Sequence, residues 1–343
     1  MVEKGTRHDV ARSRIAAAAA LLLSLSLSGC SDSGEKSDGL PSELWVNPDS
    51  QPARTARQYA AQGRHEDAAL MRRIADQPAA EWVGELPRAR ARAVTTAAAR
   101  TGRTPVLVAY NIPNRDCGRH SAGGAEGAPD YGGWIRELAA GIGDRSAVVI
   151  LEPDAVAQVV DGCFPGELRE ERLAMLRNAV ETLKALPRTW VYIDAGNAGW
   201  VRDPYALVEP LKQSGIDKAD GFSLNVSNFQ PTGATIRYGH HLSGSLGGTH
   251  FVIDTSRNGN GATNAVGSRS EAYAYPGHHE DRWCNPPGRA LGERPSTRTG
   301  DPKVDAFLWV KRPGESDGTC NGGPGAGSWW PRYALDLARN TRG

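Results

Sequence analysis

The chain has 343 residues, with 40 Lys and Arg against 39 Asp and Glu, and a formal net charge of +1 at pH 7. This near-neutral balance gives no electrostatic reason to expect nucleic acid as a partner. The sequence lacks the glycine-rich phosphate cradles of nucleotide enzymes and the CxxC and HExxH patterns of metal sites, so we expect no cofactor and no metal.

Residues 1–29 have the pattern of an export signal. A basic start precedes an apolar stretch, residues 15–27, that is too short to span a membrane comfortably. The stretch ends in LSGC, residues 27–30, which resembles a bacterial lipobox, where cleavage precedes a cysteine that becomes lipidated. We therefore expect a lipid on Cys30, a polar tether over residues 30–40, and a location on the outer face of the cytoplasmic membrane or in the medium. The alternative is an ordinary cleaved signal followed by a free cysteine.

Residues 41–343 contain no Pro/Thr/Ser-rich linker and no evident repeat, which predicts one large domain. We expect this domain to be a monomer. Once Cys30 is assigned to lipid, the remaining cysteines are Cys117, Cys163, Cys284 and Cys320. An even number of cysteines in an exported chain indicates two disulfides, for which three pairings are open.

Short apolar runs alternate with helical stretches along this domain. The predicted strands are Leu44–Val46, Pro105–Tyr110, Ala147–Leu151, Trp190–Asp194, Gly221–Asn225, His250–Asp254 and Ala306–Val310. The predicted helices are Thr55–Gln77, Pro87–Thr101, Tyr131–Gly141, Leu168–Leu186, Pro204–Ser214, Ala234–Leu246 and Tyr333–Arg339. Continuous apolar strands that alternate with helices are typical of a parallel sheet covered by helices. About seven such units favour a closed or nearly closed barrel over a doubly wound sheet.

Nearly every predicted strand is followed by a polar residue. The most informative case is VVILEPDAVA, residues 148–157, in which a buried strand ends at Glu152-Pro153-Asp154 ahead of a helix. Proline cannot extend a central ladder, so Pro153 marks the strand end. In a parallel barrel these ends share one face. That face would be rich in carboxylates and suited to polar substrates and proton transfer.

Asp154 and Asp116 are the candidate acid pair. Asp154 alone is also explained as the N-cap of the following helix. Asp116 lies in YNIPNRDCGRHSAGG, residues 110–124, where another strand end enters a glycine-rich loop. Two acids on one face can raise the pKa of one and leave the other ionised. For Asp116 the alternative is a surface ion pair with Arg115.

Further candidates lie in other loops. Asp317 is in KRPGESDGTC, residues 311–320, beside Lys311 and Glu315, although an Asp next to Gly is also a common turn residue. Three tryptophans, Trp82, Trp200 and Trp283, lie in polar loops flanked by Gly or Pro. Most tryptophans are core residues, but an aromatic face exposed beside carboxylates is how proteins hold sugar rings.

Two long runs, VAYNIPNRDCGRHSAGG at 108–124 and VVILEPDAVA at 148–157, resemble the signature motifs of glycoside hydrolase family 6. The resemblance continues at 45–51, 194–200, 221–229, 252–261, 283–292 and 305–318. The members of this family are β-1,4-glucanases, both endoglucanases and cellobiohydrolases. The resemblance implies a distorted seven-stranded parallel α/β barrel as a single catalytic domain over 41–343. It also implies a cleft at the carboxyl ends of the strands and hydrolysis with inversion at the anomeric carbon.

The resemblance also implies roles for individual residues. Asp154 resembles the general acid, Asp116 its pKa modulator and a member of the water network, and Asp317 the candidate base. Tyr110 matches the tyrosine under the distorted sugar. The positions expected to bind sugar are Trp82, Trp200, Trp283, Lys311 and Glu315, and Asp194 and Asn225 line the same cleft by position. The implied disulfides are Cys117–Cys163 and Cys284–Cys320.

The cysteine spacing bears on how a glucan chain would be attacked. Cellobiohydrolases of the family roof the cleft with long loops between the cysteine partners, and here both spans are short. This favours an open groove and attack on internal bonds of a soluble or amorphous β-1,4-glucan. The insertion at 261–281 is the one long loop available to cover part of the groove. The alternatives are an exo-acting cellobiohydrolase, a non-catalytic, lipid-anchored glucan-binding protein, and another barrel hydrolase that retains configuration.

Overall fold

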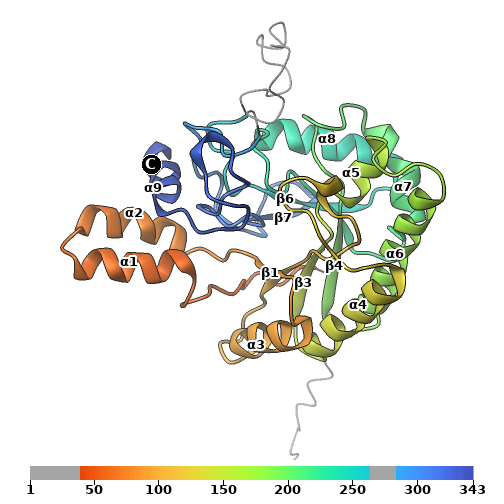
Figure 1. Ribbon diagram of the computed structural model, residues 1–343, viewed down its shortest axis with the longest axis horizontal. Helices are drawn as coiled ribbons and strands as arrows, with labels where there is room; N and C mark the ends of the chain where they lie inside the picture. Colours follow the sequence, from red (N-terminus) through yellow and green to blue (C-terminus); the bar gives the residue numbers. More distant parts are fainter. Residues whose placement is uncertain (1–38, 263–282, 343) are drawn as a thin grey trace, which may run out of the picture. The chain divides into compact units, whose positions relative to one another are not determined.

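The computed structural model describes residues 39–262 and 283–342. Seven parallel strands pair in chain order, from β1 to β7, as one sheet (Figure 1). The strands are β1 Glu81–Val83, β2 Val106–Ala109, β3 Ala147–Leu151, β4 Thr189–Asp194, β5 Gly221–Leu224, β6 His250–Asp254 and β7 Val304–Leu308. A single parallel bridge, Ala79 with Trp309, joins the two edges of the sheet. The sheet is therefore a distorted, incompletely closed barrel, which confirms the predicted fold class.

Helices follow the strands and cover the outside of the sheet (Figure 1). They are α1 Gln51–Ala61, α2 His65–Ala75, α3 Pro87–Ala99, α4 Ala128–Ile142, α5 Ala155–Val160, α6 Glu167–Lys184, α7 Val208–Gln213, α8 Thr232–Ser245 and α9 Pro331–Asn340. Three short 3-10 turns are η1 Asp116–Gly118, η2 Pro204–Leu207 and η5 Cys320–Gly322. Helices α1, α2 and α9 pack together beside β1 and β7, where the two edges of the sheet meet.

The differences from the predicted elements lie mainly at the first edge of the sheet. β1 is not predicted, because it has three residues and one β-branched side chain. The predicted strand Leu44–Val46 contributes only an isolated bridge between Leu44 and Thr104. The predicted helix Thr55–Gln77 is divided into α1 and α2, since the chain turns at Gly63 with φ of 73°.

The strand side chains alternate between two apolar layers. The layer inside the barrel contains Val106, Val108, Val148, Ile150, Trp190, Tyr192, Val252, Ala306 and Leu308. The layer against the helices contains Leu107, Ala109, Val149, Leu151, Val191, Ile193, Phe251 and Ile253. Because both faces are buried, these strands read as continuous apolar runs. The two layers fix the strands against one another, and so place the polar residues that follow the strands.

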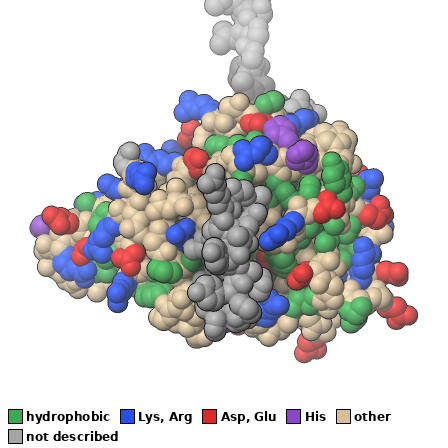
Figure 2. Space-filling view, turned by 90° about the horizontal axis from the view of Figure 1, so that it is seen from above, with side chains coloured by type: hydrophobic (Ala, Val, Ile, Leu, Met, Phe, Trp, Pro, Cys, Tyr) green, Lys and Arg blue, Asp and Glu red, His purple; other side chains and the backbone are tan. Residues whose placement is uncertain are grey.

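The surface of the domain carries both signs of charge. On the face drawn in Figure 2, acidic and basic side chains are interspersed with apolar ones. Among the described residues, no helix has the length and apolar character needed to cross a membrane.

Candidate functional site

Three buried carboxylates end three of the strands. Glu152 directly follows β3, Asp194 is the last residue of β4, and Asp254 is the last residue of β6. All three are at most 1% exposed. Burying a charged group is costly unless it is hydrogen-bonded. Each of the three carboxylates meets that requirement by accepting bonds from main-chain amides of nearby loops.

Glu152 and Asp194 hold the two loops that carry the candidate acids. Glu152 accepts from the amides of Asn111 and Ile112, each at 3.0 Å, in the loop after β2. Asp194 accepts from the amide of Asp154 at 2.8 Å. The backbone of Asp154 is therefore fixed by the neighbouring strand.

Asp254 holds the loops after β5 and β7 in the same way. Its carboxylate accepts from the amides of Ser227 at 3.0 Å and Lys311 at 2.9 Å. It also accepts from the amide of Ser256 at 2.9 Å. The position of Lys311 is thus fixed by a main-chain hydrogen bond, independently of the contacts of its side chain.

Asp154 occupies the N-cap position of α5 but makes no capping hydrogen bond with its side chain. Its φ of 72° lies in the left-handed region, which is strained for a residue with a Cβ atom. Capping therefore does not explain this aspartate. A strained backbone whose amide is bonded to Asp194 leaves the Asp154 side chain available for another purpose.

The surroundings of Asp154 favour its protonated form. Burial raises the pKa of Asp154 well above the usual range, and the negative charges of Asp194 and Asp116 raise it further. The positive charges of Arg172 and Lys311 act against this rise. Burial also raises the pKa of Asp116, against the bond at 2.7 Å that the Ser121 amide donates to it. Asp154 is therefore a carboxyl that can keep its proton near neutral pH and release it to a substrate.

The loop around Asp116 is a tight turn with a covalent tie. Asp116 and Cys117 both have positive φ, 56° and 48°. The disulfide Cys117–Cys163 joins this turn to the segment that follows α5, as predicted. Arg115 points to main-chain oxygens, donating to Tyr110 and Ser121 at 2.8 Å each. The turn therefore has a defined position relative to α5.

Asp317 is held as an ion by groups from three other segments. Its carboxylate contacts Arg257 at 2.8 Å and Lys311 at 3.0 Å, and accepts from the Asn285 amide at 3.0 Å. Burial alone would raise the pKa of Asp317, but the two cations hold it below the usual value. With both oxygens bonded and a lowered pKa, Asp317 is a weak proton acceptor.

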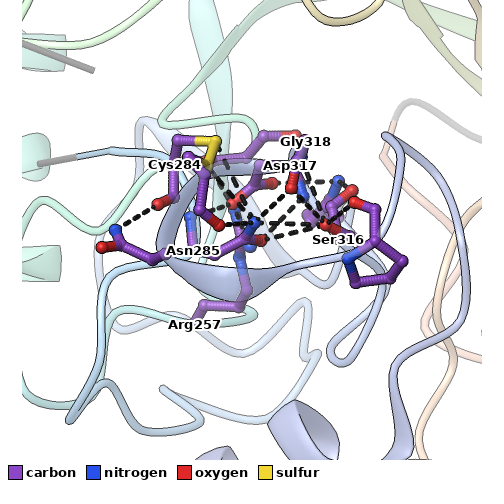
Figure 3. The surroundings of a disulfide bond; sticks show 11 residues. Arg257, Cys284, Asn285, Ser316, Asp317 and Gly318 are labelled. Carbon is purple, nitrogen blue, oxygen red and sulfur yellow. Dashed lines mark hydrogen bonds and ion pairs between the residues drawn. A yellow bond between two sulfur atoms is a disulfide. The ribbon is translucent and has the colours of Figure 1, made fainter. Parts of the chain in front are cut away.

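Asn285 connects the Asp317 loop with the second disulfide (Figure 3). Its side chain donates to the Gly318 carbonyl at 2.7 Å and to the Ser316 hydroxyl at 3.1 Å. It also accepts from the Asp317 amide at 2.8 Å. The predicted disulfide Cys284–Cys320 closes the same loop. The Asp317 loop is thus fixed both covalently and by hydrogen bonds.

Trp82 lies within β1 and not in a loop as predicted, and it packs against the apolar layer inside the barrel, whereas Trp200 packs against the layer on the helix side. Trp82, Trp200 and Trp283 are each partly exposed. The ring of Trp82 meets Tyr110 edge to face at 5.2 Å, and its indole N–H donates to the Val310 carbonyl at 2.9 Å. Trp82 and Tyr110 therefore form a fixed aromatic corner beside the loop of Asp116.

Three predicted sugar contacts have mainly protein partners. Asp194 and Asn225 are fully buried, and Asn225 bonds the main chain of Gln230 and Asp254. Glu315 is also buried, and its carboxylate pairs with Arg312 at 2.6 Å. A cavity of about 500 Å³ lies beside Glu315, and its wall includes Glu81, Arg312, Trp45 and Trp329.

Several residues that organise the site were not singled out as candidates from the sequence. Glu152 directly follows β3, Asp254 is the last residue of β6 and Arg257 comes shortly after it, so a position at a strand end is the available signal. Arg172 lies within a helix rich in charged residues, and Asn285 within a loop, so neither has a local signal. Within residues 39–262 and 283–342, no group of three or more His, Cys, Asp or Glu could hold a metal ion.

Comparison with known proteins agrees with this geometry. The family described as Glycosyl hydrolases family 6 matches residues 41–341. Endoglucanase A of Cellulomonas fimi is 44% identical over 306 residues, which are 88% of this chain and 62% of that protein. Endoglucanase 1 of Streptomyces halstedii is 41% identical over 306 residues, which are 86% of this chain and 88% of that protein. This chain thus spans less than two thirds of the Cellulomonas protein.

A solved structure is also similar. It is the endoglucanase Cel6 from Mycobacterium tuberculosis in complex with methyl-cellobiosyl-4-deoxy-4-thio-β-D-cellobioside. The TM-score is 0.78 at 40% identity, covering 88% of this chain and 98% of that one. The similarity therefore extends over most of this chain.

We expect Asp194→Asn to lower the pKa of Asp154. Burial raises the pKa of Asp194 itself to about 6, so Asp194 carries its charge above that pH. The amide removes this charge while keeping an oxygen that can accept from the Asp154 amide. Carbon-13 titration of the carboxyl groups would measure the change. Asp220→Asn is the matched control, because Asp220 accepts from a strand amide at the opposite end of the barrel. An unchanged or higher pKa of Asp154 in the Asp194 variant would contradict this electrostatic account.

Proposed function

Because the chain belongs to glycosyl hydrolases family 6, we propose that it hydrolyses internal β-1,4-glucosidic bonds of cellulose-type glucans with inversion of configuration. The observation that carries this proposal is the acid at the end of β3. Asp154 is held protonated by burial and by the charges of Asp194 and Asp116. Glycoside hydrolysis needs such a proton donor at the leaving oxygen.

The proposed first event is proton transfer from Asp154 to the glycosidic oxygen. Protonation lets the sugar leave as an alcohol while positive charge develops on the ring left behind. Tyr110, beside Asp116 and against Trp82, would lie under that ring. The charge of Asp116 raises the pKa of Asp154 before the bond breaks. The Ser121 amide, which donates to the Asp116 carboxylate, fixes the position of that charge.

The second half of the reaction needs a water on the opposite face of the sugar. In an inverting pair the acid and base stand about 6.5–9.5 Å apart to leave room for that water. Asp317 is the candidate base by position, but Arg257, Lys311 and the Asn285 amide make it a weak acceptor. We therefore assign the final proton to a water path that ends on Asp116, whose pKa burial raises. The role that we assign to Asp317 is to hold Arg257 and Lys311 in place.

Sugar binding is assigned to the exposed aromatic faces and one cation. Trp82, Trp200 and Trp283 are partly exposed and offer flat surfaces on which sugar rings pack. Lys311 is the cation: Asp254 accepts from its amide, and its ammonium group pairs with Asp317 and bonds the Ser316 carbonyl, which leaves one N–H for a sugar hydroxyl. For Asp194 and Asn225 we propose a positioning role in place of the expected sugar contact, because their polar atoms bond to the protein.

Attack on internal bonds is the mode that we propose. Each disulfide closes a short span, 46 residues for Cys117–Cys163 and 36 for Cys284–Cys320. Long loops that would roof the site have little room within those spans. Both curated relatives described above carry the name endoglucanase. The insertion at 261–281 lies almost wholly outside the described residues.

We propose further that the protein is exported and held on the cell surface by a lipid on Cys30. The support is the LSGC tetrapeptide behind an apolar signal, and two disulfides that fit an oxidising compartment. Residues 1–29 would be removed, and 30–40 would tether a monomeric catalytic domain over 41–343. Cys30→Ser should move the protein from the membrane fraction to the medium. Mass spectrometry of the wild-type N-terminal peptide should detect the lipid, and an unmodified Cys30 would contradict the anchor.

Time-resolved proton NMR with a soluble β-1,4-glucan tests the activity and its stereochemistry together. The expected first product is the α-anomer, and the early products should cover a range of chain lengths. The β-anomer appearing first would instead indicate another barrel hydrolase that retains configuration. Cellobiose as the sole early product would indicate an exo-acting cellobiohydrolase. Binding without turnover would indicate a glucan-binding protein.

Asp154→Asn tests the proposed acid. We expect hydrolysis of an unactivated glucan to fall at least about 100-fold, the scale of general acid catalysis. Aryl glycosides whose leaving groups need no protonation should lose far less activity. In the wild type, activity should fall as pH rises through the raised pKa of Asp154, because the ionised carboxyl has no proton to give. Asp144→Asn is the control, since Asp144 is exposed at the opposite end of β3. Equal losses on both substrates would remove Asp154 from this role.

A further inference from the structure

We propose that Arg172 of α6 is a positioning residue that holds the Asp116 loop and the start of α5, which follows Asp154, in one fixed arrangement. This inference rests on the proposed function for its kinetic consequence but not for its structural one. Arg172 is 2% exposed, although it belongs to a helix whose other charged residues mostly face solvent. A charged side chain is rarely buried to this extent unless it has partners within the protein.

The contacts of Arg172 supply that reason. One terminal nitrogen donates to the Pro113 carbonyl at 2.8 Å, in the loop that leads from β2 to Asp116. The Nε atom donates to the Ala155 carbonyl at 3.1 Å, one residue after Asp154. The other terminal nitrogen donates to the Gln158 side chain at 2.9 Å, also on α5. A single guanidinium thus bridges two segments that are about 40 residues apart in the chain.

The bridge acts together with two other ties between the same segments. The disulfide Cys117–Cys163 joins the far side of the Asp116 turn to the residues after α5. Glu152, next to the segment of Asp154, accepts from the amides of Asn111 and Ile112. Three ties at different points fix both the separation and the relative rotation of the two segments. A disulfide alone leaves the rotation free.

The planar fork of arginine suits this task, and lysine does not replace it. Arg172 directs separate N–H groups at three acceptors that lie in different directions. Lysine offers one nitrogen at the end of a flexible stem, so it can reach one or two of these acceptors. The guanidinium also packs over the ring of Phe164 at 4.1 Å, which closes its remaining side.

The charge of Arg172 has a second consequence for Asp154. The charged groups that face Asp154 come from four elements: Asp116 after β2, Asp194 on β4, Arg172 on α6 and Lys311 after β7. Glu152, Tyr110 and Tyr131 face Arg172 itself. Burial lowers the pKa of Arg172 to about 10, so it stays positive at neutral pH. Arg172 therefore limits how far the pKa of Asp154 rises, and its loss should raise that pKa further.

Two substitutions separate the bridge from the charge. Arg172→Lys keeps the charge and loses most of the bridge, whereas Arg172→Met loses both at similar volume. Arg145→Lys is the matched control, because Arg145 bonds Thr95 and the Gly141 carbonyl near the amino end of β3 and touches neither segment. The three variants and the wild type are compared in full-length form by amide hydrogen exchange, carbon-13 carboxyl titration and steady-state kinetics on a soluble β-glucan.

The expected pattern differs between the variants. Exchange at 110–118 and 155–160 should accelerate in both Arg172 variants and remain slow in the Arg145 control. The kcat should fall about ten- to a hundredfold in both, with KM changed less than about threefold, because misplacement affects the chemical step more than binding. The pKa of Asp154, and with it the alkaline limb of kcat/KM, should move upward in Arg172→Met and stay in place in Arg172→Lys.

Specific results would overturn the inference. Wild-type exchange at both segments in Arg172→Lys would show that the bridge is not needed. An equal fall in kcat for Arg172→Lys and Arg145→Lys would reduce Arg172 to a general stabilising residue. If Arg172→Met does not fold, Arg172→Lys decides by exchange and by its kcat-to-KM pattern. If the wild type does not hydrolyse glucan, the proposed function fails, while exchange and titration still decide the role of Arg172.

Discussion

The site depends on carboxylates that are buried at strand ends and bonded to the main chain of adjacent loops. A parallel barrel brings the ends of its strands together but does not by itself determine the conformation of the loops. Glu152, Asp194 and Asp254 do this by accepting loop amides at 2.8–3.3 Å. Each bond satisfies a donor that would otherwise be unpaired near the core, where an unmade hydrogen bond is costly. The loops therefore keep a single conformation without a regular secondary structure.

Burial also shifts the pKa values of the carboxyl groups at this end of the barrel. A carboxyl removed from water favours its neutral form, and a second negative charge nearby strengthens this preference. Both conditions hold for Asp154, whose pKa is raised by burial and by the negative charges of Asp194 and Asp116. Asp317 lies on the same face but has two cations as neighbours, so its pKa moves in the opposite direction. Two carboxyl groups at the same end of the barrel thus have pKa values that are shifted in opposite directions, and the difference comes from their partners.

Local pattern in the sequence predicts most of the sheet and points to Asp154 and Asp116 as candidate acids, but it does not predict the contacts that form when the elements pack. Five of the seven strands were recognised nearly at their true bounds, since both faces of each are apolar. β1 was missed because a three-residue strand has no period to detect. Asp154 and Asp116 are candidates because strand ends are visible in a sequence, and their catalytic roles stay a prediction. Asp317 could be located but its basicity could not be judged, because Arg257 lies 60 residues away from it in the chain.

Arg172 shows where such prediction stops for a physical reason. In an 18-residue helix with many charged side chains, a single arginine on the inner side looks like any other position of the pattern. The role of Arg172 becomes visible only in the folded chain, where its guanidinium lies between the Asp116 loop and the start of α5. The two disulfides also connect segments that are distant in the chain, and each includes a cysteine adjacent to a candidate residue, Cys117 next to Asp116 and Cys284 next to Trp283. Loops that contribute little to the apolar core gain their rigidity from such ties. The raised pKa of Asp154 depends on that rigidity, because movement of the loops would admit water and return this pKa toward its ordinary value.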